Sequence, residues 1–371
     1  MTERIFNKMK PLDDIKVLEF AGIGPGPFAC MLLADLGADV LRIDKETSLS
    51  EIHRKEFINR GRKSIVLNLK SINDVNRAKK LIEKTDVIVE GFRPGVMERL
   101  GLGPDIALSL NPKVIYGRMT GWGQTGPLSK AAGHDLNYIS LSGVLWSIGP
   151  KNHNPIPPLN LVGDYGGGSL YLVMGILAAL FKRTQTGKGG VIDAAICDGV
   201  VSLMSLIYQY HQIDKWDNQR DGNLLDGAAP FYTTYKCSDE KWISIAAIEP
   251  KFYSKLLSLL KIEESMIENR LDKNEWSSLR DRFAGIFVQK TRDEWCKLLE
   301  GTDVCFAPVL DLEEIYKHDH NKARNVFSNR KNLKQPSPVP RFSNFDNSLP
   351  DLPPPCPGEH NSSAFLDWGI D

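Results

Sequence analysis

The first 118 residues alternate short apolar segments with helical ones, and this alternation constrains the fold more than any other feature. Residues 15–20 predict a buried strand, residues 21–27 a tight loop, and residues 28–36 an apolar helix that ends at Gly37. A second strand is predicted over residues 38–44. The pattern continues with a helix at 72–84 and strands at 65–70, 86–92 and 112–118. Strands that alternate with helices form parallel sheets, so we predict an α/β fold with a Rossmann-like, doubly wound sheet.

The loop after the first predicted strand contains Gly22, Gly24 and Gly26, which invites comparison with a dinucleotide-binding fingerprint. A third glycine is missing at the required offset, and Pro25 and Pro27 remove two backbone N–H groups that a pyrophosphate would need. We therefore predict a Rossmann-like fold without a dinucleotide site, because a fold does not by itself carry a function.

The pattern changes in the second half of the chain, where strands come first and helices follow. Residues 187–193 are expected to turn into a long helix that ends near residue 213. Two strands, at 231–236 and 242–248, surround a turn. They are followed by predicted helices at 251–261, 276–289 and 293–299, a short strand at 305–310 and the beginning of a helix at 312–317. This order predicts a smaller α+β domain.

These patterns divide the chain into two predicted domains. A large Rossmann-like domain covers residues 1–213, a polar linker covers residues 214–229, and a small α+β domain covers residues 230–330. The last segment, 331–371, begins with a stretch rich in proline and asparagine. We expect it to be an extended return segment that packs on the large domain and completes it.

The stretch 131–169 carries the residues best suited to catalysis. His134 lies among small and hydrogen-bonding residues, and Asp164 closely precedes three consecutive glycines and an apolar helical run, 170–181. A carboxylate at a helix start is stabilised by free backbone N–H groups, and glycines let a ligand oxygen approach such groups closely. An imidazole, a carboxylate and N–H donors together suffice for proton transfer next to a carbonyl.

A simpler interpretation of the same residues stays open. A single His-Asp pair is common, and glycine-rich turns often only connect elements. Glu249 is a third candidate, because Pro250 holds it extended at the end of a predicted strand and aims its side chain reproducibly. The alternative for Glu249 is an ordinary carboxylate at a strand end.

Charge limits the possible partners of the chain. The 371 residues include 46 basic and 46 acidic side chains, so the formal net charge is zero, which argues against a dedicated nucleic-acid-binding protein. A local basic patch is still possible, because five basic side chains can meet at one edge of the predicted sheet: Lys45, Arg60, Arg62, Lys63 and Lys70. Such a cluster suits the phosphates of a nucleotide or of coenzyme A, and the alternative is a solvated charged surface. Arg93 and residues 121–126 follow other strands and are further binding candidates.

Cysteine usage and terminal segments indicate the compartment. Six scattered cysteines without a Cys-x-x-Cys pair predict free thiols, and neither disulfides nor a zinc site. His318, Asp319 and His320 resemble a metal site, but neighbouring lysines favour a solvated turn. The N-terminus lacks the apolar core of a signal peptide, and the C-terminus lacks a Ser-Lys-Leu-type signal. The run 170–181 is shorter than the ~20 residues that span a bilayer, so we expect a soluble intracellular protein.

Several longer motifs occur in one order over nearly the whole chain. Together they resemble family III coenzyme A transferases (the CaiB/BaiF superfamily) and, within it, the α-methylacyl-CoA racemase group. The motifs are GPGPF at 24–28, RGRKS at 60–64, RPGVME at 93–98, GHD at 133–135, PLNL at 158–161, GKG at 187–189, PFYTTY at 230–235 and AIEP at 247–250.

The resemblance implies an assembly as well as a fold. Proteins of this family are interlocked homodimers, in which a large Rossmann-like domain and a smaller domain are joined by extended linkers. Their active site lies between the large domain of one subunit and the small domain of the other. The resemblance implies neither a metal nor a separate cofactor, because coenzyme A is part of the substrate.

The resemblance also implies roles for individual residues. His134 and Asp164 match the two proton-transfer groups, and Glu249 matches the residue that hydrogen-bonds the catalytic imidazole. Lys45 stands where acyl-CoA racemases of the family usually carry arginine, so a bidentate phosphate contact would become a point contact. The positions that match the coenzyme A and acyl-thioester site are Lys45, Leu67, Asn68, Leu69, Lys70, Gly133, His134, Asp135, Leu136, Asn137 and Tyr138.

The implied reaction is epimerisation at the α-carbon of a 2-methylacyl-CoA thioester. One acid–base group is needed on each face of a planar enolate, and we predict that His134 serves the (S)-substrate and Asp164 the (R)-substrate. The enolate oxygen needs N–H donors, which the turn 164–168 is expected to provide. The compartment implied is the peroxisome or mitochondrion for a eukaryotic chain and the cytoplasm for a bacterial one, with a role in fatty-acid or bile-acid metabolism.

Two other functions remain open. In a true coenzyme A transferase of the family, the aspartate is a nucleophile that becomes a mixed anhydride and then a coenzyme A thioester. Such an enzyme does not need an imidazole at His134, whereas a two-base racemase does. A non-catalytic coenzyme A-binding protein has no reason to keep His134, Asp164 and Glu249 together.

Overall fold

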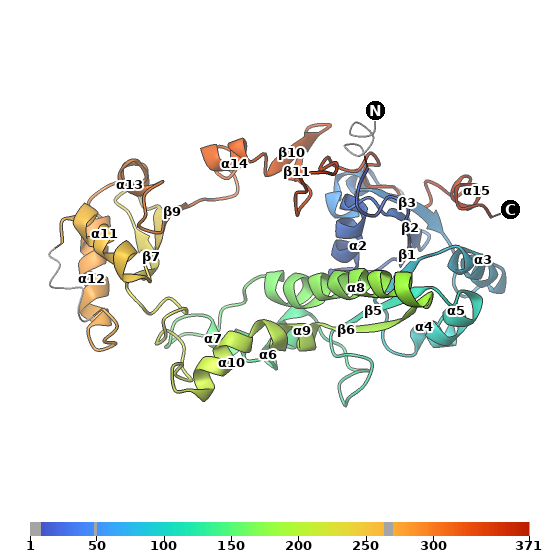
Figure 1. Cartoon of the computed structure of the whole chain (residues 1–371), viewed down its shortest axis with the longest axis horizontal. Helices are drawn as coiled ribbons and strands as arrows, with labels where there is room; N and C mark the ends of the chain where they lie inside the picture. The colour runs from blue at the N-terminus through green and yellow to red at the C-terminus, as the bar shows by residue number, and fades with distance from the viewer. Residues whose placement is uncertain (1–8, 48–49, 263–269, 371) are drawn as a thin grey trace. The chain divides into compact units, whose positions relative to one another are not determined.

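The computed structural model describes residues 9–47, 50–262 and 270–370. Their contacts form two compact units, and Figure 1 shows the elements of each. The first unit consists of Met1–Val144, Pro158–Ser205 and Asn325–Asp371, and the second of Leu145–Pro157 and Leu206–Arg324. The domain boundaries expected from the sequence stay predictions.

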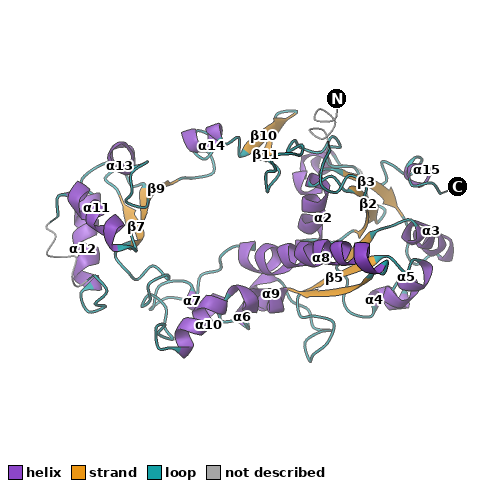
Figure 2. Ribbon diagram, in the orientation of Figure 1, coloured by secondary structure: helices purple, strands orange, loops and turns teal. Residues whose placement is uncertain are grey.

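A six-stranded parallel sheet forms the centre of the first unit (Figure 2). Its strands are β1 (Lys16–Phe20), β2 (Asp39–Asp44), β3 (Arg62–Val66), β4 (Val87–Glu90), β5 (Ile115–Thr120) and β6 (Gly190–Ala195). The spatial order is β3-β2-β1-β4-β5-β6, so the strand order reverses between β1 and β4. The predicted α/β fold with a parallel sheet is confirmed, and ligands of such sheets bind beside the carboxyl ends of the strands at this reversal.

One face of the sheet is covered by α3 (Ile72–Glu83) and α5 (Pro104–Leu110). Leu18 of β1 and Tyr116 of β5 point to this face, and both are fully buried in the same apolar cluster as residues of the two helices. Trp368, near the C-terminus, belongs to this cluster too. Burial of such side chains is the main force that holds the layer to the sheet.

The other face of the sheet is covered by α2 (Pro25–Asp35) and α8 (Tyr171–Thr186). Gly117 of β5 leaves space for α8, because a Cβ atom at Gly117 would lie 2.9 Å from the side chain of Leu172. Helices therefore cover both faces of the sheet, which explains why consecutive residues of the central strands β1 and β4 are buried.

Two strands differ from the prediction. The strand expected at 65–70 is found at 62–66 as β3, where Arg62 and Ser64 point inward and are buried. A pattern of apolar residues misses a strand whose buried side chains are polar. The turn expected at 187–193 is largely strand β6, which pairs with β5.

The single helix expected to end near residue 213 is also wrong. Two helices follow β6, α9 (Ile196–Leu203) and α10 (Ser205–Gln212), and they are separated at Met204. The apolar character of this segment continues through the break, so composition alone does not reveal it.

A continuous helix runs from Leu161 to Thr186, formed by the π-helix η3 (Leu161–Leu170) and then α8. The predicted turn at the glycines that follow Asp164 is therefore wrong. These glycines allow η3 to cross α9 at very short distance: a Cβ atom at Gly199 would lie 1.9 Å from the carbonyl oxygen of Gly167. The glycines serve the packing of two helices, and the sequence alone makes them look like a turn.

The apolar run 170–181 was expected to be too short to span a bilayer, but it is part of this longer helix. The helix has 26 residues, and by length and composition it could cross a membrane. In its most apolar window, 39% of the residues are buried inside the molecule. The core helix of a soluble protein can meet the same criteria, so this is weak evidence for a membrane span.

The second unit has a three-stranded antiparallel sheet in the order β7-β8-β9. Its elements are β7 (Tyr232–Lys236), β8 (Trp242–Ala246), α11 (Pro250–Leu260), α12 (Trp276–Phe287), α13 (Arg292–Leu299), β9 (Phe306–Val309) and α14 (Asp319–Ala323). Aromatic side chains dominate its core, including Phe231, Tyr253 and Phe283. The predicted strands and helices are confirmed, except that residues 312–317 form turns and α14 begins after them.

The segment after residue 324 belongs to the first unit. It contains an antiparallel pair and a short helix, α15 (Ala364–Asp367). Strand β10 (Phe327–Arg330) falls in the range predicted for the small domain, and β11 (Leu333–Pro336) falls where an extended segment was expected. The rest of this C-terminal segment runs beside the edge strand β3. The N–H of Gly61 donates to the carbonyl of Leu352 at 2.9 Å, and the N–H of His360 donates to the carbonyl of Ser64 at 2.8 Å.

Candidate active site

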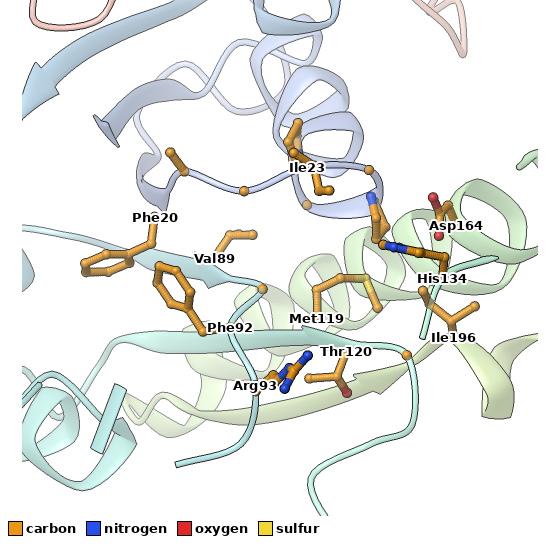
Figure 3. A pocket seen from close by; sticks show the side chains of 18 of the residues that line it. Phe20, Ile23, Val89, Phe92, Arg93, Met119, Thr120, His134, Asp164 and Ile196 are labelled. Carbon is orange, nitrogen blue, oxygen red and sulfur yellow. The ribbon is translucent and has the colours of Figure 1, made fainter. Parts of the chain in front are cut away.

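A pocket of about 1320 Å³ opens at the carboxyl ends of the central strands, where the strand order reverses (Figure 3). Loops after β1, β2, β4 and β5 line it, together with the segment around His134 and the first turn of η3. The predicted site residues that line it are Lys45, Arg93, Gly133, His134, Asn137, Tyr138 and Asp164. Residues that lie 30 or more positions apart in the chain thus meet at one site.

Other predicted site residues lie outside the lining of this pocket. Leu67 is buried in the apolar core, so only its backbone is available to a ligand, whereas Leu69 is partly buried against that core. The remaining positions that do not line the pocket are Asn68, Lys70, Asp135, Leu136 and Glu249. Glu249 belongs to the second unit, where it is extended (φ −73°, ψ 143°) and precedes Pro250, the first residue of α11.

His134 is the N-cap residue of the short helix α6 (Asp135–Ser140). Its backbone N–H donates to Oδ1 of Asn137 at 3.0 Å, and its carbonyl accepts from the N–H of Asn137 at 2.8 Å. These two bonds hold the backbone while the side chain of His134 stays exposed at the pocket. A fixed backbone with a free imidazole suits a group that must exchange protons.

Tyr138 supports the loop that leads to His134. Its hydroxyl donates to the carbonyl of Gly133, and its ring meets the ring of Trp122 edge to face at 4.8 Å between centroids. A Cβ atom at Gly121 would lie 1.9 Å from the Tyr138 ring, so the glycine there makes room for the phenol.

Asp164 lies in the first turn of η3 with its carboxyl group at the pocket. Burial raises the pKa of Asp164, and the neighbouring carboxylate of Asp135 raises it further. A hydrogen bond from the side chain of Asn160 and the nearby imidazole of His134 lower the same pKa. A carboxyl group whose pKa is raised holds its proton closer to neutral pH, as an acid–base group should.

The N–H donors expected at 164–168 are not free. The N–H of Asp164 donates to Oδ1 of Asp135 at 2.7 Å, and the N–H of Tyr165 donates to the carbonyl of Asn160 at 3.3 Å. The glycines that follow lie inside η3. Over the described ranges, the N–H groups of Asp135 and Leu136 have no acceptor, so the start of α6 offers donors that the sequence did not suggest.

The predicted basic cluster is largely wrong. Arg60 forms a two-point ion pair with Asp35, at 2.8 and 2.6 Å, and both side chains are buried. Arg62 is buried beside Glu19, with 3.2 Å between Nη1 and the carboxylate. A buried charge needs a partner of opposite sign, and these pairs lie inside the fold, away from any ligand.

The remaining lysines of that cluster differ from one another. Lys63 forms an ion pair with Asp367 at 3.0 Å, whereas Lys45 is exposed and lines the pocket. Lys45 and Arg93 are thus the two predicted cations that a phosphate in the pocket can reach.

Several lining residues were missed by the sequence analysis. Arg42, near the end of β2, forms an ion pair with Asp44 at 2.9 Å and lines the pocket. Its position near a strand end was a usable signal. Pro355 and Pro357 of the C-terminal segment also line the pocket, and no local signal predicts this, because the contact joins opposite ends of the chain.

Gly24 lies close to the carboxyl group of Asp164. Its φ is +72°, and a Cβ atom there would lie 3.0 Å from Oδ2 of Asp164. The loop 21–27, which does not match a dinucleotide fingerprint, thus forms the surface against which this carboxyl group rests.

No group of three His, Cys, Asp or Glu side chains could hold a metal ion in the part of the chain that the structure describes. In the segment 318–320, which resembles a metal site in sequence, Nε2 of His318 lies 2.8 Å from a carboxylate oxygen of Glu300. This imidazole therefore already contacts a carboxylate within the second unit.

Comparison with known proteins agrees with this geometry. The model of "CoA-transferase family III" matches residues 12–361. α-Methylacyl-CoA racemases of Mus musculus and Homo sapiens are each 42% identical to the chain, over 97% of it and over 93% and 94% of their own lengths. The crystal structure of a CAIB/BAIF family protein from Brucella suis superimposes with a TM-score of 0.83 at 27% identity, covering 97% of this chain and 100% of that one. The chain therefore belongs to CoA-transferase family III.

Proposed function

We propose that this chain epimerises the α-carbon of 2-methyl-branched acyl-CoA thioesters, between (R) and (S), by proton transfer through an enolate. The observation that carries the proposal is the presence of His134 and Asp164 in one pocket, on different elements, at the site where the sheet binds ligands. The similarity to α-methylacyl-CoA racemases supports it.

The chemistry needs two acid–base groups because inversion moves a proton from one face of the α-carbon to the other. One group removes the α-proton, and the other, protonated beforehand, returns a proton to the opposite face. We assign the (S)-substrate to His134 and the (R)-substrate to Asp164. The raised pKa of Asp164 helps it to be protonated while the imidazole is neutral, which the (S)-to-(R) direction requires.

The enolate oxygen needs hydrogen-bond donors where its negative charge develops. The donors that we assign to it are the N–H groups of Asp135 and Leu136, which have no acceptor and directly follow His134; neither residue lines the pocket, so the substrate carbonyl must reach the start of α6 beside His134. Such donors are typically worth about 10²–10³ in kcat when they are already in place.

The coenzyme A part of the substrate is assigned to the same pocket. Lys45 and Arg93 supply positive charge for its phosphates, and the volume of about 1320 Å³ is ample for a large ligand. Lys45 offers a point charge where a guanidinium would make a planar two-point contact.

An exposed apolar stripe on η3 and α8 is our proposed contact surface for a second copy of the chain. These exposed side chains recur at helical spacing: Leu170, Met174, Leu177 and Phe181. Exposed apolar surface of this kind is typical of an interface, and the family resemblance makes a homodimer the expected assembly. We propose that Glu249 of one subunit then supports His134 of the other.

A coenzyme A transferase is the second candidate function, and the half-buried Asp164 favours it as a nucleophile. In that reaction the carboxylate of Asp164 attacks the thioester, and the thiolate of coenzyme A leaves. The imidazole of His134 beside Asp164 favours the epimerase, because the transferase reaction gives it no task.

Proton NMR of a 2-methylacyl-CoA in deuterium oxide, without a second acid, tests the proposal. We expect loss of the α-proton signal and collapse of the methyl doublet toward a singlet. His134→Ala and Asp164→Asn, assayed with each epimer, then test the assignment of the two bases. Absence of exchange in the unmodified protein contradicts the epimerase, and formation of a new thioester after addition of a carboxylic acid would favour the transferase.

A further inference from the structure

The carboxylate of Asp135 connects the two segments that carry the proposed proton-transfer groups. Asp135 follows His134 directly as the first residue of α6, and its Oδ1 accepts the backbone N–H of Asp164 at 2.7 Å. This bond satisfies the N–H of Asp164, which lies in the first turn of η3, where no carbonyl within the helix can reach it.

The fit between this carboxylate and the helix is close. A Cβ atom at Gly163 would lie 2.1 Å from Oδ1 of Asp135 and 3.0 Å from Cγ2 of Ile139. Gly163 is buried, so no larger residue fits between α6 and η3 without moving one of them. The contact therefore sets how far apart the two segments lie.

We infer that Asp135 is a positioning residue, whose carboxylate fixes the first turn of η3 and thereby sets where the Asp164 side chain lies relative to His134. The inference rests on the proposed function, in which these two groups face opposite sides of one carbon atom. A displacement of about 1 Å from productive geometry can cost about 10²-fold in rate, so a short tether between the two segments has a large effect.

The charge of Asp135 gives this role a signature that a purely structural contact lacks. After burial, the nearby negative charge of Asp135 is the next cause of the raised pKa of Asp164. Removing that charge while keeping the hydrogen bond therefore lowers the pKa of Asp164. The reaction needs one proton shared between His134 and Asp164, and acid stops it by protonating both. A lower pKa of Asp164 then moves the acid limb of the rate profile to lower pH.

Several other groups lie near the carboxyl group of Asp164. The imidazole of His134 and a hydrogen bond from the side chain of Asn160 both lower the pKa of Asp164. The charge of Asp164 in turn raises the pKa of the Tyr138 phenol. The loop before α2 approaches with Gly24, which has no side chain. On α9, Cys197 and Asp198 are hydrogen-bonded to each other at 3.4 Å.

The test compares two substitutions at one position. Asp135→Asn keeps an oxygen that accepts the N–H of Asp164 but removes the charge, so we expect the acid limb of kcat/KM to move down by about one pH unit. Asp135→Ala removes the tether as well, and we expect kcat to fall on the order of 10²-fold while KM changes little. Both are measured by epimerisation of each substrate epimer and by α-proton exchange in deuterium oxide.

Two further variants separate positioning from charge and from general damage. Gly163→Ala keeps the charge of Asp135 but displaces its carboxylate, so kcat should fall as it does in Asp135→Ala. Asp105→Asn removes an exposed carboxylate from the first turn of α5, outside the pocket, and should leave the pH profile unchanged. Circular dichroism and thermal melting identify a variant that fails to fold, in which case the isosteric Asp135→Asn decides.

An unmoved acid limb in Asp135→Asn, or an unchanged kcat in folded Asp135→Ala, overturns the inference. Failure of the proposed function is seen separately, because the unmodified protein then shows no α-proton exchange at all. If the unmodified protein exchanges the α-proton and the variants behave like it, only the role of Asp135 is wrong.

Discussion

At the scale of single residues, the site depends on a glycine at which any side chain would collide with a proposed catalytic group. Gly24 has φ +72° and faces Oδ2 of Asp164 at 3.0 Å from its ideal Cβ position. A methyl group there strains the loop and pushes the proposed acid–base carboxyl group aside. We expect Gly24→Ala to lower kcat by about 10–100-fold and, because alanine is strained at φ +72° and ψ −120°, to lower the free energy of unfolding by about 1–3 kcal/mol.

Epimerisation kinetics and thermal melting together check this prediction. Gly190→Ala is the matched control, because its ideal Cβ meets nothing within 4 Å and Gly190 lies outside the pocket. A Gly24→Ala enzyme as active as the unmodified protein would show that the loop yields to the methyl group.

Arg60 contributes to stability through its buried ion pair with Asp35, although its sequence position suggested a phosphate ligand. Removing it leaves the buried carboxylate of Asp35 without its partner. We expect Arg60→Ala to lower the free energy of unfolding by about 3–5 kcal/mol. Urea unfolding followed by circular dichroism measures it, and a large rise in KM at unchanged stability would instead indicate a phosphate site.

Lys45 should behave in the opposite way, because its side chain is exposed and lines the pocket. Lys45→Ala is expected to raise the Kd for coenzyme A about tenfold without changing stability, through loss of one phosphate contact. Lys45→Arg is expected to lower that Kd, because a guanidinium makes two-point contacts with phosphate. Isothermal titration with coenzyme A decides, and equal affinities of all three proteins would exclude Lys45 from the phosphate site.

At the scale of elements, the close packing of η3 against α9 fixes the helix that carries Asp164. Gly199 allows this crossing, since its ideal Cβ would lie 1.9 Å from the carbonyl oxygen of Gly167. Backbone atoms cannot move aside as a flexible side chain can. We expect Gly199→Ala to destabilise the protein by about 3 kcal/mol or more and to lower activity.

Thermal unfolding measures the effect at Gly199. Gly285→Ala, in α12, is the control, because Gly285 is exposed and its ideal Cβ meets nothing within 4 Å. Equal melting temperatures for both variants would mean that η3 and α9 can move apart without loss of stability.

At the scale of the whole molecule, the proposed homodimer makes two testable statements. The first concerns the exposed apolar stripe of η3 and α8, where Met174 and Phe181 are 58% and 67% exposed in the single chain. A charge at either position would be buried in an interface without a partner. We expect Met174→Asp and Phe181→Asp to produce monomers, as seen by sedimentation velocity, and dimers that persist in both variants would remove the stripe from the interface.

The second statement concerns a site shared between subunits. If Glu249 of one subunit supports His134 of the other, Asp164→Asn and Glu249→Ala subunits complement each other. Unfolding and refolding the two inactive proteins together is expected to restore part of the activity, whereas separate refolding is not. No recovery in mixed dimers, verified by a mass tag, would place both groups in the same chain.

Much of the fold and part of the site were predictable because they depend on local order. Alternating apolar strands and helices predict the parallel sheet, since each element must bury one face against the next. His134 and Asp164 could be selected as candidates because an imidazole and a carboxylate near glycines suit proton transfer. The same residues also fit a simple connecting turn, so their roles came from the family resemblance. The motifs that carry the family resemblance are local as well, so a single sequence suffices to detect them.

The rest was decided by contacts between residues far apart in the chain. Whether Arg60 binds a phosphate or an internal carboxylate depends on Asp35, and whether the N–H of Asp164 is free depends on Asp135. The glycines after Asp164 look like a turn until α9 is seen to cross them. Charge, hydrogen bonding and close packing are satisfied by any suitable partner in space, and only the tertiary structure identifies that partner.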